Sequence, residues 1–563
     1  MDSSGSLQTQ RPIPYRIRIG VTGHRELPQP DAISSLISQV LDSKLDDLFD
    51  VVSRDALRQA RHTPVLLSVV SPLAEGADRV VAYEVLKRDG ATLEAVLPLV
   101  SDDYLQTFAN DESRLEFLDL LGKCRQPRVL RLRRLNQDFR ADQIADARNR
   151  AYADVGRFVV DHCDVLIAIW DGKPARGVGG TAEVVAYAQE QKRPLIHIWP
   201  ASAEPIQVSK GNGLNAKSIG MIDEFNEYRV EPGSAAEFIA RLEQVHFGEL
   251  PGPTIPEPAK DAIRQILFPF YLRASVIAKQ NQKRYRRAGT YGYLLPSIAV
   301  ASVAIGTLMP AYGVWAFAFE LAILAVALSI VGSAHRQQSA EKWLESRFLT
   351  ERLRDAIYMA GCGVEVANIA VPPQMSETEQ PDDWMLRVFE EIWNRMPRME
   401  GCASQYCEAL REYIAEQWVE SQIKFHDAKA KTEGGRGAWL YLLGRILLFC
   451  TLGAAAFHIL VRAMSGRLEG HDNMAAERIL TFIALVFPAL ASALAGLRSH
   501  REYLRLENRS RNMSSRLRQL KDRIQRAATA SDFEQVLRET EATMLQEAQD
   551  WLMLMRMVTI ETT

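Results

Sequence analysis

Four long segments of this chain carry almost no charged side chains, and they constrain its fold more than any other feature. Between Ala288 and Ala334 the only charged residue is Glu320, and a Pro310–Gly313 turn interrupts the run midway. Each half is about 20 residues long, enough to cross about 30 Å of hydrocarbon at 1.5 Å per residue. The pattern predicts four membrane spans, at residues 291–309, 312–331, 438–461 and 479–497. The alternative is that these segments are helices buried in a protein core.

Basic residues flank one end of the predicted spans. These residues precede the first span and follow the second and fourth, whereas the turn at Pro310 carries no charge. They include Lys283, Arg284, Arg286, Arg287, Arg336, Lys342, Arg498, Arg501, Arg505 and Arg509. Lys and Arg beside membrane spans stay on the cytoplasmic side, so both termini are expected in the cytoplasm. Residues 1–10 are polar and lack the apolar core of a signal peptide, which agrees with that expectation.

The second pair of apolar segments repeats features of the first. His335-Arg336 is followed by Arg352-Leu353-Arg354, and His500-Arg501 is followed by Arg516-Leu517-Arg518 at nearly the same separation. A polar helix with aromatic residues precedes each pair. The pattern predicts one unit of helix, two spans and helix, used over 261–400 and again over 401–563, with chance similarity of two basic segments as the alternative.

The first part of the chain has a different pattern, with short apolar runs alternating with amphipathic segments over residues 15–250. The expected strands are Arg16–Val21, Val65–Val70, Leu93–Leu97, Val129–Leu132, Val165–Trp170 and Leu195–Trp199, and the clearest helices are Ala77–Leu86 and Ala141–Asp161. Such alternation predicts an α/β domain whose parallel sheet is covered by helices on both faces. Residues 1–14 are expected to be disordered, and 251–260 to form a Pro-rich linker.

Three loops at expected strand ends carry the candidate site, because an open parallel sheet forms its ligand crevice there. The first loop ends in Gly23-His24-Arg25, where glycine permits close backbone approach and Arg25 offers a fork of donors to a phosphate or carboxylate. A plain surface turn is the alternative reading of this loop.

The second loop, Ser71 to Arg79, contains Glu75, Gly76 and Asp78 and leads into a helix whose amino end favours anions. Its alternative is that Asp78 merely caps the helix and Arg79 lies in solvent.

The third loop follows the strand that ends in Trp170, passes Asp171-Gly172 and runs through Gly177-Val178-Gly179-Gly180 into Thr181-Ala182-Glu183. The glycines leave room for a phosphate or ribose. Thr181 is expected to cap the following helix, and Glu183 to reach ribose hydroxyls.

Composition excludes two classes of function. With 67 Lys and Arg against 70 Asp and Glu, the net charge of -3 lacks the excess of positive charge typical of nucleic-acid binders, so no nucleic-acid partner is expected. The six cysteines contain no CxxC pair, and no metal site is expected.

The segments IGVTGHR, SPLAEGADR and DVLIAIWDG with GVGGTAEVVAYA resemble the SLOG superfamily over about residues 16–200. That superfamily comprises Rossmann-like domains that include nucleotide sensors, the DNA-processing DprA proteins and the LOG phosphoribohydrolases. The resemblance implies a pocket for a nucleotide or nucleotide-derived ligand, with no further cofactor. Its residues would be Gly23, His24, Arg25, Glu75, Gly76, Asp78, Trp170, Asp171, Gly179, Gly180, Thr181 and Glu183.

One departure from the LOG pattern bears on catalysis. In PGGxGTxxE the catalytic Glu follows the Thr by three residues, whereas here Glu183 follows Thr181 by two. On a helix that difference rotates the carboxylate by roughly 100°. Ligand sensing is therefore favoured over hydrolysis. The alternative is a membrane-tethered nucleotide phosphoribohydrolase or glycohydrolase with Glu183 or Glu75 as general base.

The membrane half is similar in architecture to the SLATT domains, two-span modules associated with SLOG domains in bacterial conflict systems. The pairing implies a sensor-effector of the bacterial inner membrane, which binds a nucleotide signal in anti-phage defence and responds by oligomerising or opening a pore. The expected partners are the ligand, the lipid bilayer and further copies of the chain. A nucleotide-regulated transporter or channel is a third reading.

Two charged residues fall within the predicted spans. Glu320 lies about 12 Å from the outer end of the second span, and Arg445 about 10 Å from the inner start of the third. Their depths differ by roughly 8 Å on the same rise per residue. We therefore expect Arg445 to extend toward the membrane surface, and Glu320 to face either a lumen or an oligomer interface.

Overall fold

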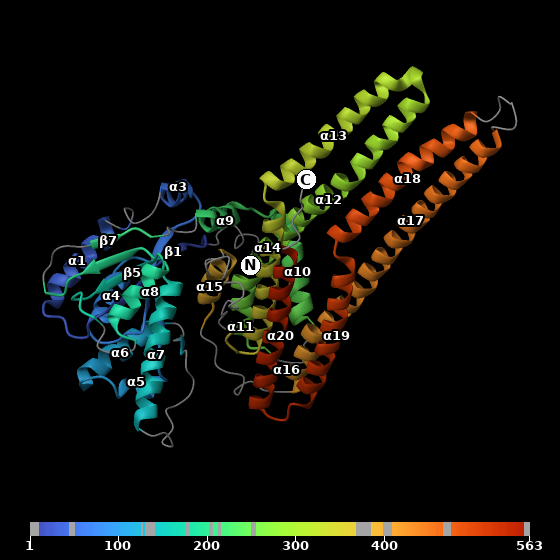
Figure 1. The fold of residues 1–563 in the computed structure, drawn as a ribbon. Helices are drawn as coiled ribbons and strands as arrows, with labels where there is room; N and C mark the ends of the chain where they lie inside the picture. Colours follow the sequence, from blue (N-terminus) through green and yellow to red (C-terminus); the bar gives the residue numbers. More distant parts are fainter. Residues whose placement is uncertain are drawn as a thin grey trace. The chain divides into compact units, whose positions relative to one another are not determined.

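The computed structural model divides the chain into two compact units (Figure 1). One comprises residues 8–229 and 369–398, and the other 1–7, 230–368 and 399–563. We call them the α/β unit and the helical unit. The structure describes residues 11–43, 45, 51–124, 128–129, 141–174, 179–201, 207–211, 216–248, 255–366, 384–397, 408–465 and 474–556.

The α/β unit is built on a mostly parallel sheet of seven strands, in the order β4-β3-β2-β1-β5-β6-β7. Only β7 runs antiparallel, against β6. The strands are β1 (Tyr15–Gly23), β2 (Val65–Ser71), β3 (Thr92–Leu97), β4 (Arg128–Val129), β5 (Val165–Ile169), β6 (Leu195–Ile198) and β7 (Gln207–Ser209). β5 is buried along its whole length, as expected of a central strand covered on both faces.

Helices cover both faces of this sheet. Right-handed crossovers place α1 and α4 together on one face, and α7 and α8 together on the other. Under α7 and α8 lies a core that includes Val155, Val159, Leu166 and Val184. The helices of this unit are α1 (Pro30–Ser43), α3 (Val51–Gln59), α4 (Ala77–Leu86), α5 (Ser101–Leu105), α6 (Asp111–Lys123), α7 (Ala141–His162), α8 (Thr181–Glu190), α9 (Ala216–Glu227) and α15 (Trp384–Asn394).

The expected α/β class is confirmed, with differences at its margins. Helix α4 has the predicted bounds, whereas the short strand β7 was not predicted. Residues 1–10 of the segment expected to be disordered lie outside the described residues. Within 11–14 that expectation is wrong, because Ile13 is fully buried and its amide donates to the Asn226 side chain at 2.9 Å.

Helix α15 belongs to the α/β unit, although the sequence pattern placed it in the first helical repeat, 261–400. Arg387 of α15 donates to Asp164 at 2.8 Å and to the Arg16 carbonyl at 2.7 Å. Glu391 pairs with Arg16, and the Arg18 guanidinium donates to Glu390 at 2.6 Å. These partners lie where β1 and β5 begin. We call this end of the sheet the amino edge and the opposite end the carboxyl edge.

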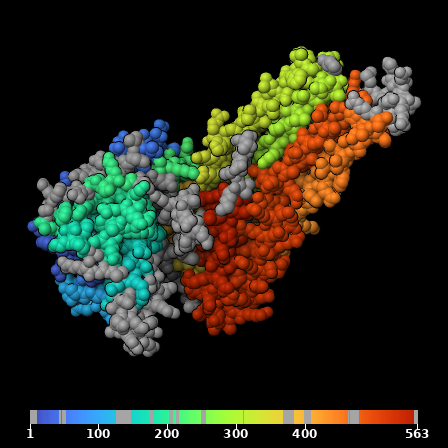
Figure 2. Space-filling model, viewed as in Figure 1, coloured from blue at the N-terminus to red at the C-terminus, as the bar shows by residue number. Residues whose placement is uncertain are grey.

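The helical unit contains four helices long and apolar enough to cross a membrane. Much of their surface is not covered by other described residues of the unit: Val314 is 81% and Leu321 is 71% exposed (Figure 2). The elements of this unit are α10 (Pro232–Phe247), α11 (Glu257–Ala262), α12 (Phe268–Leu308), α13 (Gly313–Arg336), α14 (Ser339–Gly361), α16 (Glu408–Tyr413), α17 (Ser421–Ser465), α18 (Met474–His500), α19 (Tyr503–Arg526) and α20 (Ala530–Arg556).

The same order of backbone features occurs twice in this unit. A π-helical turn, Ile263–Leu267 or Ile414–Glu420, leads directly into the long helix α12 or α17. After the second apolar helix, a single left-handed residue precedes α14 or α19; it is Gln338 at φ 51° in one case and Glu502 at φ 50° in the other. Left-handed backbone is uncommon for such side chains, so its recurrence supports two copies of one unit.

Two boundaries inferred from the sequence are wrong. Residues 15–250 were expected to form one domain, but α10 belongs to the helical unit, where His246 packs on Phe268 and Tyr358. The expected linker, 251–260, extends into that unit as well: Ile255 is buried and α11 begins at Glu257. Residues 251–254 lie outside the described residues.

Candidate functional site

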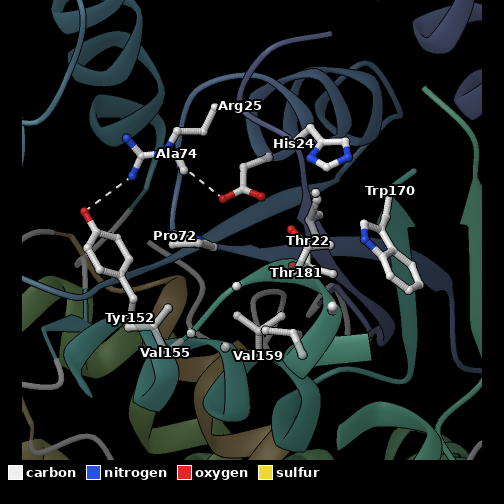
Figure 3. A pocket seen from close by; sticks show the side chains of 18 of the residues that line it. Thr22, His24, Arg25, Pro72, Ala74, Tyr152, Val155, Val159, Trp170 and Thr181 are labelled. Atoms are coloured by element: carbon white, nitrogen blue, oxygen red, sulfur yellow. Dashed lines mark hydrogen bonds between the residues drawn. The ribbon is translucent and has the colours of Figure 1, made fainter. Parts of the chain in front are cut away.

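The α/β unit has a cavity of about 370 Å³ at the carboxyl edge of the sheet, where β1 and β5 lie side by side (Figure 3). From β1 the sheet extends through β2, β3 and β4 in one direction and through β5, β6 and β7 in the other. The direction of strand addition therefore reverses between β1 and β5. Crevices of open parallel sheets form at such reversals. The expected convergence of three loops is what the structure shows, since the loops after β1, β2 and β5 all line this cavity.

The first loop places His24 and Arg25 at the cavity. The His24 amide donates to the Ile169 carbonyl at 3.0 Å, and the Asp171 amide donates to Nε2 of His24 at 3.1 Å. These bonds tie the first loop to the third. Among the described residues, the Arg25 guanidinium donates only to the Tyr152 hydroxyl, at 3.5 Å, and most of its donors make no such bond there (Figure 3).

The second loop contributes Asp78, whose side chain lies within the cavity lining and is 4% exposed. The Ala74 amide donates to its carboxyl at 3.1 Å. Burial raises the pKa of Asp78 to about 7, although the Ala74 amide and the charges of Arg25 and Arg79 act in the opposite direction. Asp78 therefore exchanges a proton near neutral pH in a site built largely of donors.

Other residues of the second loop hold its shape. The expectation that Arg79 could lie in solvent is wrong, because it is 2% exposed and donates to the Leu73 carbonyl and to Ser113. Gly76 has φ +78°, and a Cβ there would lie 2.2 Å from the Arg25 carbonyl oxygen. Only glycine permits this close approach of the first two loops.

The third loop contributes Trp170, Asp171, Gly179, Gly180 and Thr181 to the lining. The Trp170 indole donates to the Lys173 carbonyl at 2.9 Å. Hydrogen bonding from the Lys173 ammonium, 3.0 Å from the carboxylate, is the main cause that lowers the pKa of Asp171 to about 2. Gly177 and Val178 lie outside the described residues.

Helix α8 begins at this loop, and its first two residues, Thr181 and Ala182, line the cavity. Its N-cap is Gly180, so the expected capping role of Thr181 is wrong: Thr181 is the first helical residue. The first amides of a helix lack internal partners and carry partial positive charge. This end of α8 is thus suited to an anionic group.

Three of the predicted residues do not line the cavity: Glu75, Gly76 and Glu183. Glu75 accepts from the Ala109 amide at 2.9 Å and from the Ser113 hydroxyl at 2.5 Å. Glu183 turns back and accepts from the Gly179 amide at 2.8 Å. Glu75 and Glu183, the two carboxylates considered as general bases, therefore stabilise loop backbone through these hydrogen bonds.

Two tyrosines complete the lining and were missed by the sequence reasoning. Tyr104 of α5 and Tyr152 of α7 have ring centroids 6.3 Å apart. The Tyr104 hydroxyl is buried and has no hydrogen-bond partner among the described residues. A buried, unpaired donor at a cavity is costly unless a ligand or water satisfies it. Tyr104 lies in the short helix that follows β3, a strand end outside the three loops singled out from the sequence, and Tyr152 lies within α7.

The two predicted intramembrane residues lie in the helical unit and are not brought together. Glu320 lies on α13 and has no ion pair within the described part of the chain. Arg445 of α17 packs its guanidinium 5.6 Å from the ring centroids of Tyr441 and Phe449.

The cavity thus combines the Arg25 cation, the ion pair of Lys173 with Asp171, the start of α8, the Tyr104 hydroxyl and the Asp78 carboxyl. This set suits a ligand with an anionic group and hydroxyls. A cluster of side chains suited to a metal ion does not occur within the described ranges. Comparisons with protein-family models, curated proteins and solved structures find no match for this chain.

Proposed function

We propose that this protein is a membrane-bound sensor-effector that binds a nucleotide or nucleotide-derived ligand in the cavity of its α/β unit. The observation that carries the proposal is the set of unused donors at the carboxyl edge: Arg25, the first amides of α8 and the Tyr104 hydroxyl. A phosphate is the anion best matched to a helix amino end and a guanidinium fork. Asp78 would accept from a ribose hydroxyl or a base amino group. The SLOG resemblance supports the same ligand class.

We propose that the response to ligand binding occurs in the membrane. Ligand binding favours one arrangement of the α/β unit, and the four apolar helices answer by oligomerising or opening a pore in the inner membrane of a prokaryotic cell under phage attack. A ligand shifts such an equilibrium only by its differential affinity for the two states. The SLATT-like architecture supports this assignment, and Glu320 is the candidate residue for the conduction path.

Thermal-shift measurements on the full chain in detergent test the binding step. The full chain is needed because α15, at residues 384–394, completes the α/β unit. Cyclic dinucleotides, ADP-ribose derivatives and mononucleotides are the probes. A ligand at roughly 100 times its Kd adds about 2.7 kcal/mol of stability, a shift of several degrees.

Two variants and one control make this measurement specific. Arg25→Ala removes the guanidinium and Gly180→Trp fills the cavity, so both should abolish the shift. Lys123→Ala removes an exposed cation that pairs with Asp119 on α6, and it should leave the shift intact. A ligand shift that survives both cavity variants would contradict the site, and release of free base from any bound nucleotide would overturn the sensor in favour of a hydrolase.

Liposome leakage tests the response. Reconstituted protein should release a trapped dye only when the ligand is added, and Arg25→Ala should not release it. Glu320→Ala should change the rate or ion selectivity of release. Equal leakage with and without ligand would favour a constitutive channel over a sensor-effector.

A further inference from the structure

Arg445 lies inside an apolar helix, and the function proposed above gives it no role. It follows Ala438, the start of the predicted span, by seven residues, a depth of about 10 Å. Its guanidinium lies 5.6 Å from the ring centroids of both Tyr441, one turn nearer the start of the span, and Phe449, one turn farther along it. Helical side chains point toward the amino end of their helix, so Arg445 carries its charge back toward the membrane surface.

A second guanidinium reaches the same tyrosine from the neighbouring helix. Arg498, at the end of α18, lies with its guanidinium carbon 4.9 Å from the Tyr441 ring centroid. Tyr441 is 50% exposed on the outside of the α17–α18 pair. The Tyr441 ring therefore contacts two guanidinium groups, one from α17 and one from α18.

These two cations have no acidic partner. Within the described residues, neither Arg445 nor Arg498 forms an ion pair or a hydrogen bond. Two acids that follow Arg498 in the chain are already paired: Glu502, just before α19, lies 3.4 Å from Arg505, and Glu507 of α19 lies 2.5 Å from Arg511. Two like charges beside hydrocarbon repel each other and gain little from water, so an anion at this point would be bound favourably.

The depth of the pair identifies the kind of anion. Trp439, Tyr441 and Tyr291 are all exposed, and they lie at the starts of the predicted spans 438–461 and 291–309 within α17 and α12. Exposed Trp and Tyr of membrane helices gather at the headgroup level of the bilayer. The anions of that layer are lipid phosphates, and guanidinium groups bind phosphate oxygens through paired donors.

We propose that Arg445, Arg498 and Tyr441 form a binding site for the headgroup phosphate of an anionic phospholipid. The two guanidinium groups clamp the phosphate, and the Tyr441 ring fixes both at the required depth. The site lies entirely within the helical unit and is independent of the nucleotide cavity. Failure of the nucleotide proposal would therefore leave it unaffected.

Native mass spectrometry of the full chain in a neutral detergent tests the site, with phosphatidylglycerol as the probe and phosphatidylcholine as the zwitterionic comparison. Arg445→Gln or Arg498→Gln should weaken phosphatidylglycerol binding roughly tenfold, the usual effect of losing one charged hydrogen-bonding partner. The double variant should bind both lipids alike. Arg336→Gln is the matched control, since Arg336 ends α13 and donates only to the Gly332 carbonyl of its own helix.

Three results would overturn the proposal. They are wild-type phosphatidylglycerol affinity in both single variants, equal affinity of the wild type for the two lipids, and displacement of the lipid by millimolar inorganic phosphate. The last would show a site for free phosphate. Lipid-free melting temperatures establish that each variant is folded. If Arg445→Gln does not fold, Arg498→Gln decides the question, because Arg498 lies at a helix end.

Discussion

Charged side chains lie at both edges of the same sheet in the α/β unit, the amino edge under α15 and the carboxyl edge at the cavity. At the amino edge, Arg387 and Asp164 are 4% and 2% exposed and pair at 2.8 Å. At the carboxyl edge, Arg25 reaches only a tyrosine hydroxyl, and Asp78 receives only a backbone amide. Buried charges are thus paired with each other at the amino edge, whereas Arg25 and Asp78 at the carboxyl edge form no ion pair among the described residues. Changes at the amino edge should cost stability, and changes at the carboxyl edge should cost binding.

The largest effect is expected at the amino edge. Arg387→Ala leaves Asp164 buried without its cation, and breaking such a pair from one side costs about 3–5 kcal/mol. Thermal unfolding of the full chain in detergent should show a large drop in the melting temperature of the α/β unit. A loss below about 1 kcal/mol, the range of exposed pairs, would remove the distinction drawn between the two edges.

Asp78 at the carboxyl edge should make the stability of the α/β unit depend on pH. Because the pKa of Asp78 is raised to about 7, the folded state holds a proton that the unfolded chain releases near pH 4. This contribution to stability is complete below about pH 4 and is lost as pH rises through about 7, at up to about 1.4 kcal/mol per pH unit. The melting temperature of the wild type should fall relative to that of Asp78→Asn between about pH 5 and about pH 8. Parallel pH profiles would contradict the buried, titrating carboxyl.

A steric change at the carboxyl edge should have an intermediate effect. A Cβ at Gly23 would lie 2.4 Å from the Ala77 Cβ and 2.7 Å from the Ile169 carbonyl oxygen. Gly23→Ala should therefore destabilise the fold by about 1–3 kcal/mol through overpacking. Gly122→Ala is the control, since a Cβ there meets nothing within 4 Å. Equal melting temperatures for the two variants would show that the loops adjust freely.

The smallest effect is expected for Glu390 of α15, the more exposed member of its pair with Arg18. Glu390 is 45% exposed where it contacts Arg18, so Glu390→Gln should change stability by less than about 1 kcal/mol. Comparing Glu390→Gln with Arg387→Ala separates what burial and what charge each contribute to the free energy of unfolding, because both residues lie on α15. A loss as large as that of Arg387→Ala would mean that burial does not set the strength of these pairs.

The sheet and the convergence of its loops could be predicted because both depend on local patterns. Apolar runs such as Val165–Ile169 and the periodicity of Ala77–Leu86 identify strands and helices from neighbouring residues alone. The carboxyl ends of parallel strands then meet by topology. Strand β7, with only three residues and an exposed Val208, lacks such a pattern.

The remaining features depend on contacts between distant residues. The pattern of Trp384, Val388 and Ile392 predicts an amphipathic helix, but not that it pairs with Asp164, more than two hundred positions earlier. Tyr104 reaches the cavity only through the packing of α5. The sequence also says nothing about competing local bonds, which turn Glu75 and Glu183 away from the cavity.

The position of α15 in the chain has a consequence for biosynthesis. Its residues, 384–394, are translated after α12 and α13, so the ribosome has already delivered two apolar helices before the amino edge of the sheet can be closed. Until then Asp164 lacks its pairing with Arg387, and Arg16 lacks its pairing with Glu391. A nascent chain stalled before residue 384 should therefore carry an α/β unit that is more easily cleaved by protease than the finished one. The order of synthesis thus places completion of the α/β unit after synthesis of the first two apolar helices.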